Sequence, residues 1–505
     1  MRSSTIAPPD QHNTRLMDNV HPAGWVNPKP SGRYNMVVIG AGTAGLVTAA
    51  GAAGLGARVA LIERAWMGGD CLNFGCVPSK ALIRAAQTAG EMRQASRFGL
   101  NLKNGVAVDF AAVMERMRRL RADLSAHDAA ARFRSLGVDV FLGEARFCAR
   151  DAIEIGGQQL RFSKAAITTG ARASAPPIPG LEKSGYLTNE TVFSLTTLPR
   201  RLAIIGGGPI GCELAQAFRR FGSDVVIMEA MPRILLREDR DAAMRVEQAL
   251  VREGVKLMVG CDIKSVSTRE AERIIAYERD GNTSEITVDQ LIVSTGRTPV
   301  VEALKLDLAG VAYDERDGVQ VNDYLQTTNR RIFAAGDVCT AYRFTHMADA
   351  MARIVIRNAL FMGRRRANAL TLPWCTYTDP ELAHVGLDES AAEAKGIRIS
   401  TFMQEMAEVD RAVLDGETEG FVKIHLRAGT DRIVGATIVA SHASEIISEL
   451  TVAIAHRIGL AKLAEVIHPY PTQAEAVRKA ADAYNRTRLT PGRKCLLERW
   501  LGWRR

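Results

Sequence analysis

Two cysteines five positions apart are the side chains of this sequence best suited to redox chemistry. Cys71 and Cys76 lie in residues 68–80, which read Gly-Gly-Asp-Cys-Leu-Asn-Phe-Gly-Cys-Val-Pro-Ser-Lys. In a regular α-helix the Cα atoms of residues i and i+5 are about 8.6 Å apart, whereas a disulfide spans about 7 Å at most. A bridge therefore needs an irregular segment, which Gly75 permits. We expect one reversible disulfide that carries an electron pair.

The residues around Cys76 predict a reactive thiolate. Pro78 fits the first turn of a helix but not its interior, so we expect Cys71 before a helix and Cys76 at or near its first turn. The positive end of the helix dipole lowers the pKa of a thiol in that position. A metal clip is the alternative. Zinc clips use a second pair of ligands, and no second cysteine pair lies nearby in the sequence.

The elements that must position this pair begin with a glycine-rich loop about 26 residues before Cys71. A β-branched run at residues 37–39 leads into the loop, a helical stretch follows, and a strand at residues 59–62 ends at Glu63. This order is typical of a dinucleotide-binding motif. We expect the loop to bring backbone amides to a pyrophosphate and Glu63 to accept hydrogen bonds from ribose hydroxyls. The loop glycines are Gly40, Gly42 and Gly45.

The same motif recurs further along the chain. A strand at residues 202–205 precedes a loop with Gly206, Gly208 and Gly211, and the next strand ends at Glu229. In both motifs the acid follows the last loop glycine by 18 residues. One glycine fingerprint is weak evidence, but two with matched spacing indicate two dinucleotide sites. The alternative is a pair of tight turns without a ligand.

Two dinucleotide sites beside a cysteine pair indicate two cofactors with different tasks. A flavin exchanges electrons with both a hydride donor and a thiol pair, so we expect FAD at the first loop and a nicotinamide nucleotide at the second. Glu229 favours the free ribose 2′-hydroxyl of NADH over the 2′-phosphate of NADPH. Arg233 and Arg237 follow closely and could weaken that preference.

Length and composition indicate a globular protein of several domains. The chain has 505 residues, 47% hydrophobic and 24% charged, which predicts roughly three domains. The eight cysteines do not form a disulfide framework, so we expect the remaining thiols reduced and the protein in the cytoplasm. No apolar run reaches the roughly 20 residues of a membrane span, and we expect no membrane partner.

The net charge of +9 favours anionic ligands. The tight basic cluster at residues 364–366 has no nucleic-acid motif beside it, so we expect a basic face that attracts nucleotides, and no nucleic-acid partner.

The sequence patterns predict an α/β protein with two Rossmann-like domains and a C-terminal α+β domain. Residues 103–136 have the spacing of a surface helix or helix pair, and residues 165–170 and 291–297 are similar strand endings where the chain crosses between domains. In the last domain we expect strands at 420–426 and 433–439 and helices at 445–458 and 473–484. The expected divisions are a flexible arm (1–33), the FAD-binding domain (34–180 and 299–370), the NAD(P)-binding domain (181–298), the α+β domain (371–490) and a basic tail (491–505).

From about Tyr34 to Pro491 the chain resembles the class I pyridine nucleotide-disulfide oxidoreductases. The resemblance rests on residues 68–80, both glycine loops, the Ala-Ala-Gly-Asp at residues 334–337 and the closing motif at residues 468–475. It implies that hydride passes from the nicotinamide to FAD and then to the disulfide. It also implies a homodimer, built by the C-terminal domain, in which each active site borrows the closing motif of the partner.

The resemblance also assigns roles to single residues. Cys76 would face the flavin as the charge-transfer thiolate, and Cys71 would be the interchange thiol that meets substrate. Lys80 would sit near the flavin and pair with Glu213, although an ordinary salt bridge on a helix surface is the alternative. The residues expected to bind the cofactors, besides the loop glycines, Glu63 and Glu229, are Lys80, Thr169, Gly170, Gly296, Arg297, Gly336, Asp337 and His346.

The closing motif departs from the best-known members of the family. The dihydrolipoamide and glutathione enzymes carry a catalytic His where this chain has Tyr470, paired with an acid that is retained here as Glu475. A phenol, with a pKa near 10, is a poor base at neutral pH. His468 matches an earlier His of the motif and could be recruited in its place.

At this position the chain instead resembles the mercuric reductases, which carry a Tyr there. A phenol beside two thiolates suits the binding of a soft metal ion. Two other features of that group, a Cys-x-x-Cys domain before the first loop and a C-terminal Cys-Cys pair, are not in this sequence, which has only Cys495 near its end. We expect a mercuric-reductase-like enzyme with a small-molecule or metal-ion acceptor and no resident metal. The alternatives are a dihydrolipoamide dehydrogenase and, in another class, a flavin redox sensor of low turnover.

Overall fold

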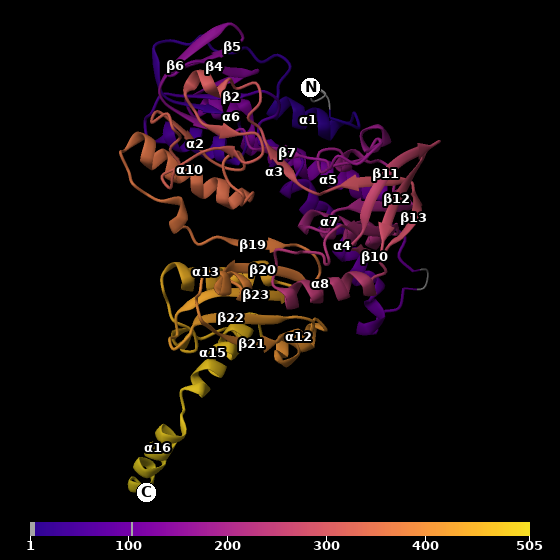
Figure 1. Cartoon of the computed structure of the whole chain (residues 1–505), viewed down its shortest axis with the longest axis vertical. Helices are drawn as coiled ribbons and strands as arrows, with labels where there is room; N and C mark the ends of the chain where they lie inside the picture. Colours follow the sequence, from indigo (N-terminus) through magenta and orange to yellow (C-terminus); the bar gives the residue numbers. More distant parts are fainter. Residues whose placement is uncertain (1–5, 103–104) are drawn as a thin grey trace. The chain divides into compact units, whose positions relative to one another are not determined.

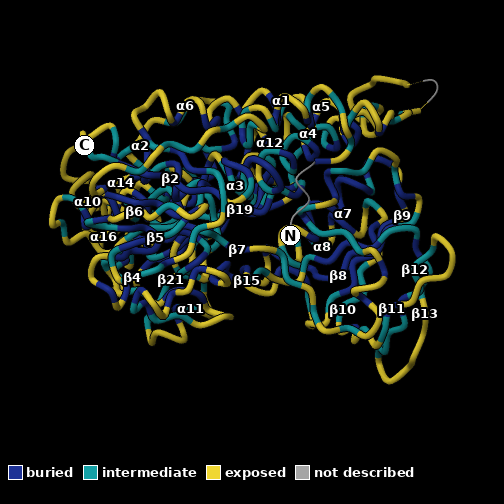
Figure 2. The backbone as a smooth tube through the Cα atoms, turned by 90° about the horizontal axis from the view of Figure 1, so that it is seen from above, coloured by how far each residue is buried: buried dark blue, intermediate teal, exposed yellow. Residues whose placement is uncertain are grey.

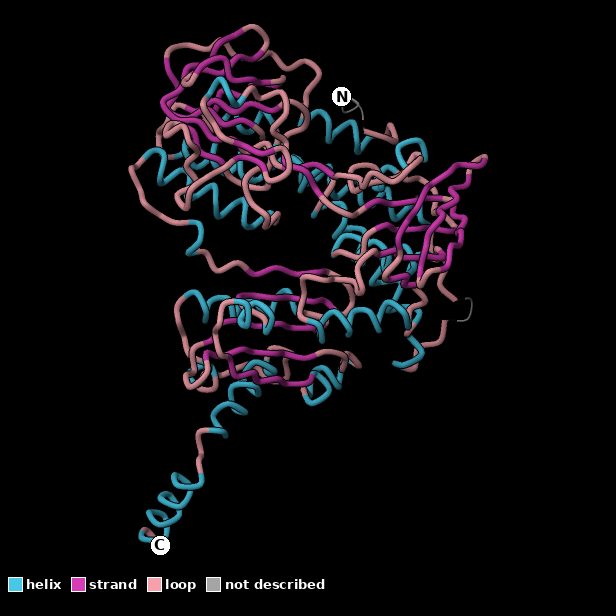
Figure 3. The backbone as a smooth tube through the Cα atoms, in the orientation of Figure 1, coloured by secondary structure: helices cyan, strands magenta, loops and turns pink. Residues whose placement is uncertain are grey.

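The computed structural model describes residues 6–102 and 105–505 and has the predicted α/β architecture (Figures 1 and 3). The chain forms two compact units, which are described separately. Unit 1 contains Met1–Gly207, Ala217–Ala230 and Lys256–Ala369, and unit 2 contains Gly208–Gln216, Met231–Val255 and Leu370–Arg505. Unit 1 holds two separate parallel sheets, as expected of two Rossmann-like domains.

The first sheet of unit 1 carries the first glycine loop. Its strand order is β3-β2-β1-β6-β5-β4, with β18 paired to β6. Five strands run parallel: β1 (Arg33–Ile39), β2 (Val59–Glu63), β3 (Val138–Leu142), β6 (Gln158–Ile167) and β18 (Ile332–Ala334). The antiparallel edge is formed by β4 (Ala145–Ala149) and β5 (Ala152–Ile155). Every residue of β2 is buried, as expected where helices cover both faces of a parallel sheet (Figure 2).

The second parallel sheet follows the second glycine loop in the predicted way. Its order is β10-β9-β8-β14. The strands are β8 (Arg201–Ile205), β9 (Asp224–Glu229), β10 (Lys256–Val259) and β14 (Gln290–Val293). An antiparallel sheet of β11 (Asp262–Arg269), β12 (Glu272–Arg279) and β13 (Asn282–Val288) is inserted before β14. The two predicted crossovers lead into β7 (Ala171–Ala173) and β15 (Arg297–Pro299), which pair with each other.

The helices of unit 1 connect these strands. The predicted helix pair within residues 103–136 is confirmed over the described residues, as two helices, α5 and α6; residues 103 and 104 lie outside them. The helices are α2 (Thr43–Gly54), α3 (Gly69–Asn73), α4 (Cys76–Arg93), α5 (Phe110–Ser125), α6 (Ala130–Ser135), α9 (Leu306–Ala309) and α10 (Thr345–Leu360). The hairpin of β16 (Tyr313–Asp314) and β17 (Gly318–Val319) completes the unit, and α7 (Pro209–Phe221) is divided between the two units.

The N-terminal arm differs from the expectation of a flexible segment. Residues 11–20 form helix α1 (Gln11–Val20), capped by Asp10 and packed against α5. Leu16 and Val20 are fully buried. Beyond α1, Asn27 exchanges two hydrogen bonds, of 2.8 and 2.9 Å, with the backbone of Leu142 at the edge strand β3. Residues 11–27 are ordered because the apolar side chains of α1 lie on one face and the side-chain amide of Asn27 pairs with a strand edge. Residues 1–5 of the predicted arm lie outside the described residues.

Unit 2 is built on an antiparallel sheet of order β19-β20-β23-β22-β21. The strands are β19 (Pro373–Thr376), β20 (Glu381–Gly386), β21 (Ile399–Glu405), β22 (Phe421–Arg427) and β23 (Ile433–Ala440). The helices are α8 (Arg240–Arg252), α11 (Glu389–Ala394), α12 (Asp410–Asp415), α13 (Ala443–Ala455), α14 (Leu460–Leu463), α15 (Glu475–Thr487) and α16 (Pro491–Trp503). The two strands and two helices that the sequence predicts here are confirmed as β22, β23, α13 and α15.

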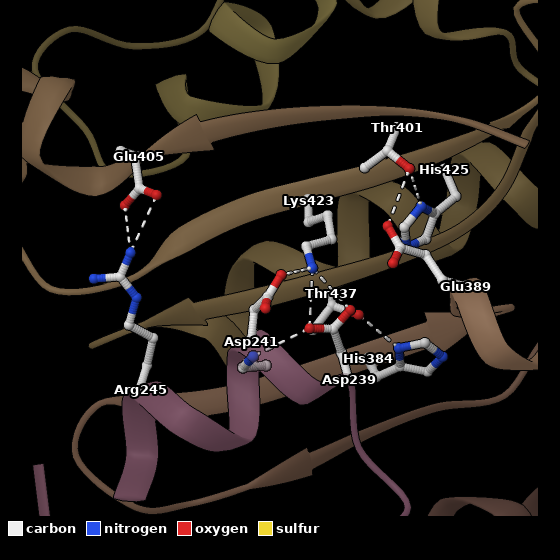
Figure 4. A network of polar contacts seen from close by, with 11 residues as sticks. Asp239, Asp241, Arg245, His384, Glu389, Thr401, Glu405, Lys423, His425 and Thr437 are labelled. Carbon is white, nitrogen blue, oxygen red and sulfur yellow. Dashed lines mark hydrogen bonds and ion pairs between the residues drawn. The ribbon is translucent and has the colours of Figure 1, made fainter. Parts of the chain in front are cut away.

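A buried polar network joins α8 to the sheet of unit 2 (Figure 4). Lys423 of β22 is only 3% exposed, and its Nζ lies 3.0 and 3.1 Å from the two carboxylate oxygens of Asp239. It also donates to Asp241 at 2.6 Å. Asp239 in turn caps α8 by accepting from the amide of Ala242. The ion pair therefore anchors the start of α8 on a central strand.

The basic tail forms α16, all of whose residues are exposed, and its first turn is capped by Thr490. Within residues 6–102 and 105–505, no helix has the length and apolar character that crossing a membrane requires.

Candidate active site

The two cysteines lie on consecutive helices of unit 1. Cys76 is the first residue of α4 and Cys71 precedes that helix, as predicted, but Cys71 itself lies in a short helix, α3, that the sequence did not predict. The chain breaks its helical path between them at Gly75, where an added Cβ would come within 3.0 Å of the carbonyl oxygen of Asp70. This break supplies the irregular segment that a bridge requires. Both residues are free thiols in this structure.

The two thiols share a proton unequally. A hydrogen bond from Cys71 is the main cause that lowers the pKa of Cys76 to about 6, with help from Thr345 and the charge of Lys80. Burial and Asp70 oppose that shift. The same hydrogen bond, followed by burial, raises the pKa of Cys71. At neutral pH the pair therefore holds its thiolate on Cys76 and its proton on Cys71.

Thr345 is a site residue that the sequence analysis missed. It is the first residue of α10, and its Oγ1 lies 3.3 Å from the Sγ of Cys76. The next residue, His346, was predicted to bind a cofactor, and its ring stacks on Phe344 at 5.5 Å between centroids. No helix was predicted after Asp337, and nothing local in the sequence connects Thr345 with a cysteine.

The first glycine loop has the close approaches that require glycine. Gly40 has φ +100°, and a Cβ there would lie 2.5 Å from the carbonyl oxygen of Thr168. A Cβ on Gly45 would lie 1.8 Å from the Gly40 oxygen, and Gly42 caps α2. The loop therefore exposes its backbone amides at the start of α2, an arrangement that suits a pyrophosphate.

Glu63 closes this loop from the end of β2. Its carboxylate oxygens accept hydrogen bonds of 2.7 Å from the amides of Ala41 and Ala65. A cavity beside Gly40 and Glu63 is also lined by Arg64 and Thr169. Its place at the ends of β1 and β2 suits the adenosine part of a dinucleotide, so these residues fit FAD; the contact of Glu63 with a ribose stays a prediction.

Arg297 lies between the redox segment and the predicted flavin-binding acid. Its guanidinium is 3.1 Å from the carboxylate of Asp70 and 3.7 Å from that of Asp337. Burial raises the pKa of Asp337, and the charge of Arg297 opposes that rise. The preceding Gly336 has φ +81°. The contact of Arg297 with a cofactor stays a prediction; the structure shows that Arg297 bonds to Asp70, the neighbour of Cys71.

Three further residues that were predicted to bind a cofactor, Thr169, Gly170 and Gly296, lie in the two crossovers at residues 165–170 and 291–297. Thr169 donates from Oγ1 to the carbonyl of Val300 at 2.6 Å, and Gly170 has φ +70°. A Cβ on Gly296 would lie 3.1 Å from the hydroxyl of Ser174. Their contacts with a cofactor stay predictions.

The second glycine loop repeats the geometry of the first. Gly206 has φ +108°, and a Cβ there would lie 2.9 Å from the carbonyl oxygen of Ser294. Glu229, at the end of β9, accepts from the amide of Gly207 at 2.6 Å, just as Glu63 accepts from Ala41. The loop continues through Gly208 and Gly211 into α7, and no atom lies within 4 Å of a Cβ built on Gly208. This open backbone suits the phosphates of a nicotinamide nucleotide.

The guanidinium of Arg233 is bonded to its own loop. It donates 2.8 Å hydrogen bonds to the carbonyls of Leu235 and Leu236 and one of 2.9 Å to that of Glu238. Because these carbonyls occupy its donors, Arg233 is poorly placed to hold a 2′-phosphate. Arg237 is exposed.

In the closing motif of unit 2, Tyr470 is not bonded to Glu475, the acid with which the family pattern would pair it. Tyr470 is 70% exposed and donates to the carboxylate of Asp410 at 2.9 Å, a bond that raises the pKa of the phenol. Glu475 is buried and accepts from Arg478 at 2.5 Å, while one of its oxygens has no partner. His468 contacts the carboxylate of Glu449 at 3.1 Å. Neither Glu475 nor His468 thus bonds to the phenol.

The predicted pair of Lys80 and Glu213 joins residues of different units and stays a prediction. Lys80 acts on Cys76 through its charge. Glu213 is buried and accepts from the amide of Tyr377 at 2.9 Å.

Comparisons with known proteins agree with this geometry. Residues 34–352 match the family described as pyridine nucleotide-disulphide oxidoreductase, and residues 372–481 match its dimerisation domain. A mercuric reductase from Staphylococcus aureus is 34% identical over 90% of this chain and 83% of its own. A dihydrolipoyl dehydrogenase from Chlamydia muridarum is 33% identical over 89% of this chain and 96% of its own.

Among solved structures, the Cu(II) complex of the HOCl-induced flavoprotein disulfide reductase RclA from Escherichia coli is similar. Its TM-score is 0.79 at 30% identity, over 88% of this chain and 98% of that one. LpdA from Mycobacterium tuberculosis has a TM-score of 0.81 at 27% identity, over 89% and 99%. The chain therefore belongs to the pyridine nucleotide-disulphide oxidoreductase family, whose members depend on FAD and NAD(P)H.

Proposed function

We propose that this enzyme passes electron pairs from NADH, through FAD and the Cys71–Cys76 pair, to a thiophilic metal ion, as a mercuric-reductase-like enzyme. The observation that carries the proposal is the placement of two thiols on α3 and α4, on either side of the break at Gly75, where Cys71 and Thr345 both bond to Cys76 and lower its pKa. Such a pair has one thiolate ready to face an electron donor and one protonated thiol ready to meet an acceptor.

The chain's own residues account for the proton and electron balance. The first glycine loop and Glu63 would hold FAD, which would supply the disulfide with an electron pair taken from the nicotinamide. The Cys71–Cys76 disulfide accepts those two electrons and its S–S bond breaks. Cys71 takes up one proton, and the hydrogen bonds from Cys71 and Thr345 hold Cys76 as a thiolate. When the two sulfurs return the electron pair to Hg(II), the disulfide forms again, the proton is released and the metal leaves as Hg(0). With Cu(II) as acceptor, the same electron pair reduces two ions to Cu(I).

Tyr470 supports a metal ion over a disulfide as acceptor. Reduction of a disulfide needs an acid-base group that titrates near neutral pH, whereas the hydrogen bond to Asp410 moves the pKa of this phenol further up. The relatives include both possibilities, since one is named mercuric reductase and another dihydrolipoyl dehydrogenase, and a similar structure is a Cu(II) complex. The phenol can serve as a neutral neighbour for a metal held by two sulfurs.

We infer NADH as the donor and a homodimer as the working form. Glu229 places a carboxylate where a 2′-phosphate would lie, and the donors of Arg233 are occupied by backbone carbonyls. The matched dimerisation domain supports a homodimer in which residues 468–475 complete the site of the partner.

An acceptor screen with NADH tests the proposal. Hg(II), Cu(II), lipoamide, glutathione disulfide, quinones and oxygen are compared at equal NADH, with Cys71→Ser and Cys76→Ser as controls. The expected result is fastest NADH oxidation with Hg(II) or Cu(II), lost in both variants. Fastest turnover with lipoamide would instead assign a dihydrolipoamide dehydrogenase. Slow oxidation with every acceptor would indicate a redox sensor.

A further inference from the structure

Helix α1 is bonded to the redox segment through a buried arginine of α5. Arg121 is 1% exposed and bridges two carbonyl oxygens. One guanidinium nitrogen donates to the side-chain oxygen of Asn13 in α1 at 2.8 Å, and another donates to the backbone oxygen of Asn73 at 2.9 Å. Asn73 is the last residue of α3, between the two cysteines in sequence. A side chain of the N-terminal helix is thus linked, through Arg121, to a residue two positions after Cys71.

Arg121 is a buried cation, and it depends on these two hydrogen-bond acceptors. Burial and the neighbouring cation of Arg118 lower the pKa of Arg121 to about 10. Arg118 is paired with Asp10, the residue that also caps α1. The Nε of Arg121 has no partner, so Asn13 and Asn73 supply the hydrogen bonds that keep this buried cation in place.

Asn73 also bonds to the backbone of the residues just before Cys71. Its side-chain nitrogen donates to the carbonyls of Met67 at 3.0 Å and Gly69 at 2.8 Å. The amide of Met67 donates to the carbonyl of Val20, the last residue of α1, at 3.1 Å. Helix α1 therefore supports the segment on both sides of Cys71.

We propose that α1 is a positioning element of the redox pair, in which Asn13 acts through Arg121 on Asn73 and so holds Cys76 at Thr345. The inference rests on the proposed function, because it assumes that the pair is redox-active. The family match begins at residue 34, so α1 lies outside the matched domain, whereas Arg121 and Asn73 lie within it. Asn13 and Arg121 touch neither cysteine, and their role is to place the segment between them.

The test is the pH profile of Cys76 alkylation in the full-length, thiol-reduced enzyme. Iodoacetamide reacts with the thiolate, and mass spectrometry assigns the label to Cys76 or Cys71. The groups that act on Cys76, namely Cys71, Thr345, Lys80 and Asp70, are unchanged in every variant. In Asn13→Ala, we expect the midpoint of the profile to rise by about one pH unit, a tenfold change in the thiolate equilibrium, because a displaced Cys76 loses its hydrogen bonds.

Asn19→Ala is the matched control. Asn19 also lies on α1 and donates to Ser125 of α5 at 2.8 Å, but its partner does not reach the redox segment. Asn13→Asp keeps an acceptor for Arg121 and serves as the rescue. We expect both variants to keep the wild-type midpoint. If Asn13→Ala does not fold, Arg121→Lys replaces it, since an ammonium group lacks the fork that bridges both oxygens.

The outcomes separate this inference from the proposed function. A rise in Asn13→Ala or Arg121→Lys alone supports α1 as a positioning element. A wild-type midpoint in those variants, or an equal rise in Asn19→Ala, overturns it. Failure of NADH to generate the Cys71 and Cys76 thiols in the wild-type enzyme would instead overturn the proposed function.

Discussion

Thr345 Oγ1 lies 3.3 Å from Cys76 Sγ, although the two residues are 269 positions apart in the chain. The contact joins the first residue of α10 to the first residue of α4. Together with the hydrogen bond from Cys71, it favours the thiolate form of Cys76. The thiolate form of Cys76 therefore depends on the connection between β18 and α10 as well as on residues 68–80.

Replacing Thr345 by Val should raise the pKa of Cys76. The wild-type value is about 6, so the thiolate is present above that pH and is lost as the pH falls through it. Removing a hydrogen bond to a charged sulfur should move that loss upward by about one pH unit. The long-wavelength charge-transfer absorbance of the two-electron-reduced enzyme, measured against pH, checks this. Thr345→Ser, which keeps the hydroxyl, should retain the wild-type profile, and a Val variant that also retains it would refute the role of Thr345.

Replacing Tyr470 by His should raise turnover with dihydrolipoamide, if a base is what this enzyme lacks. The phenol is held in its protonated form by the bond to Asp410, whereas an imidazole titrates near neutral pH. General base catalysis contributes about a hundredfold or more. Steady-state kinetics of NAD⁺ reduction check this, with Tyr470→Phe as the control that should show no gain. An unchanged His variant would mean that another feature excludes the dithiol.

The sequence predicted the parts of the site that depend on local pattern. Gly40 and Gly206 stand at loops whose spacing to Glu63 and Glu229 is a property of one strand-helix-strand motif, and both acids close their loops as that geometry requires. Cys76 was placed correctly because Pro78 marks the first turn of a helix.

The features that could not be predicted from the sequence depend on packing between distant segments or are too short to give a pattern. Helix α1 was expected to be flexible because its composition is polar, yet Leu16 and Val20 form a buried stripe against α5. Thr345 could not be found because nothing local relates α10 to a cysteine. The short helix around Cys71 was missed because five residues carry too little periodic signal.

Replacing Glu229 by Ala should relax the preference for NADH. The carboxylate at the end of β9 accepts from Gly207 and leaves a negative charge where a 2′-phosphate would bind. Its removal should lower the ratio of kcat/KM for NADH to that for NADPH by about tenfold, from one unfavourable charge contact of about 1.4 kcal/mol. The FAD content of the variant is the control. A wild-type enzyme that already prefers NADPH would contradict the assignment.

Replacing Lys423 by Met should destabilise unit 2. Lys423 is 3% exposed and neutralises Asp239, which is also buried, so the variant leaves an uncompensated carboxylate, at a cost of about 3–5 kcal/mol. Arg252→Ala is the comparison, because it breaks an exposed pair with Glu419 and should cost no more than about 1 kcal/mol. Urea denaturation measures both. Equal stability of the two variants would show that the buried pair does not anchor α8.

Anaerobic reduction with one equivalent of NADH, followed by alkylation and peptide mapping, tests the relay most directly. We expect NADH to make Cys71 and Cys76 newly reactive, and we expect that adding Hg(II) or Cu(II) in excess, then removing it with a chelator, returns both to the unreactive disulfide. The other six cysteines should label equally before and after NADH. Flavin reduction without new labelling at Cys71 and Cys76 would show that the pair does not accept the electrons.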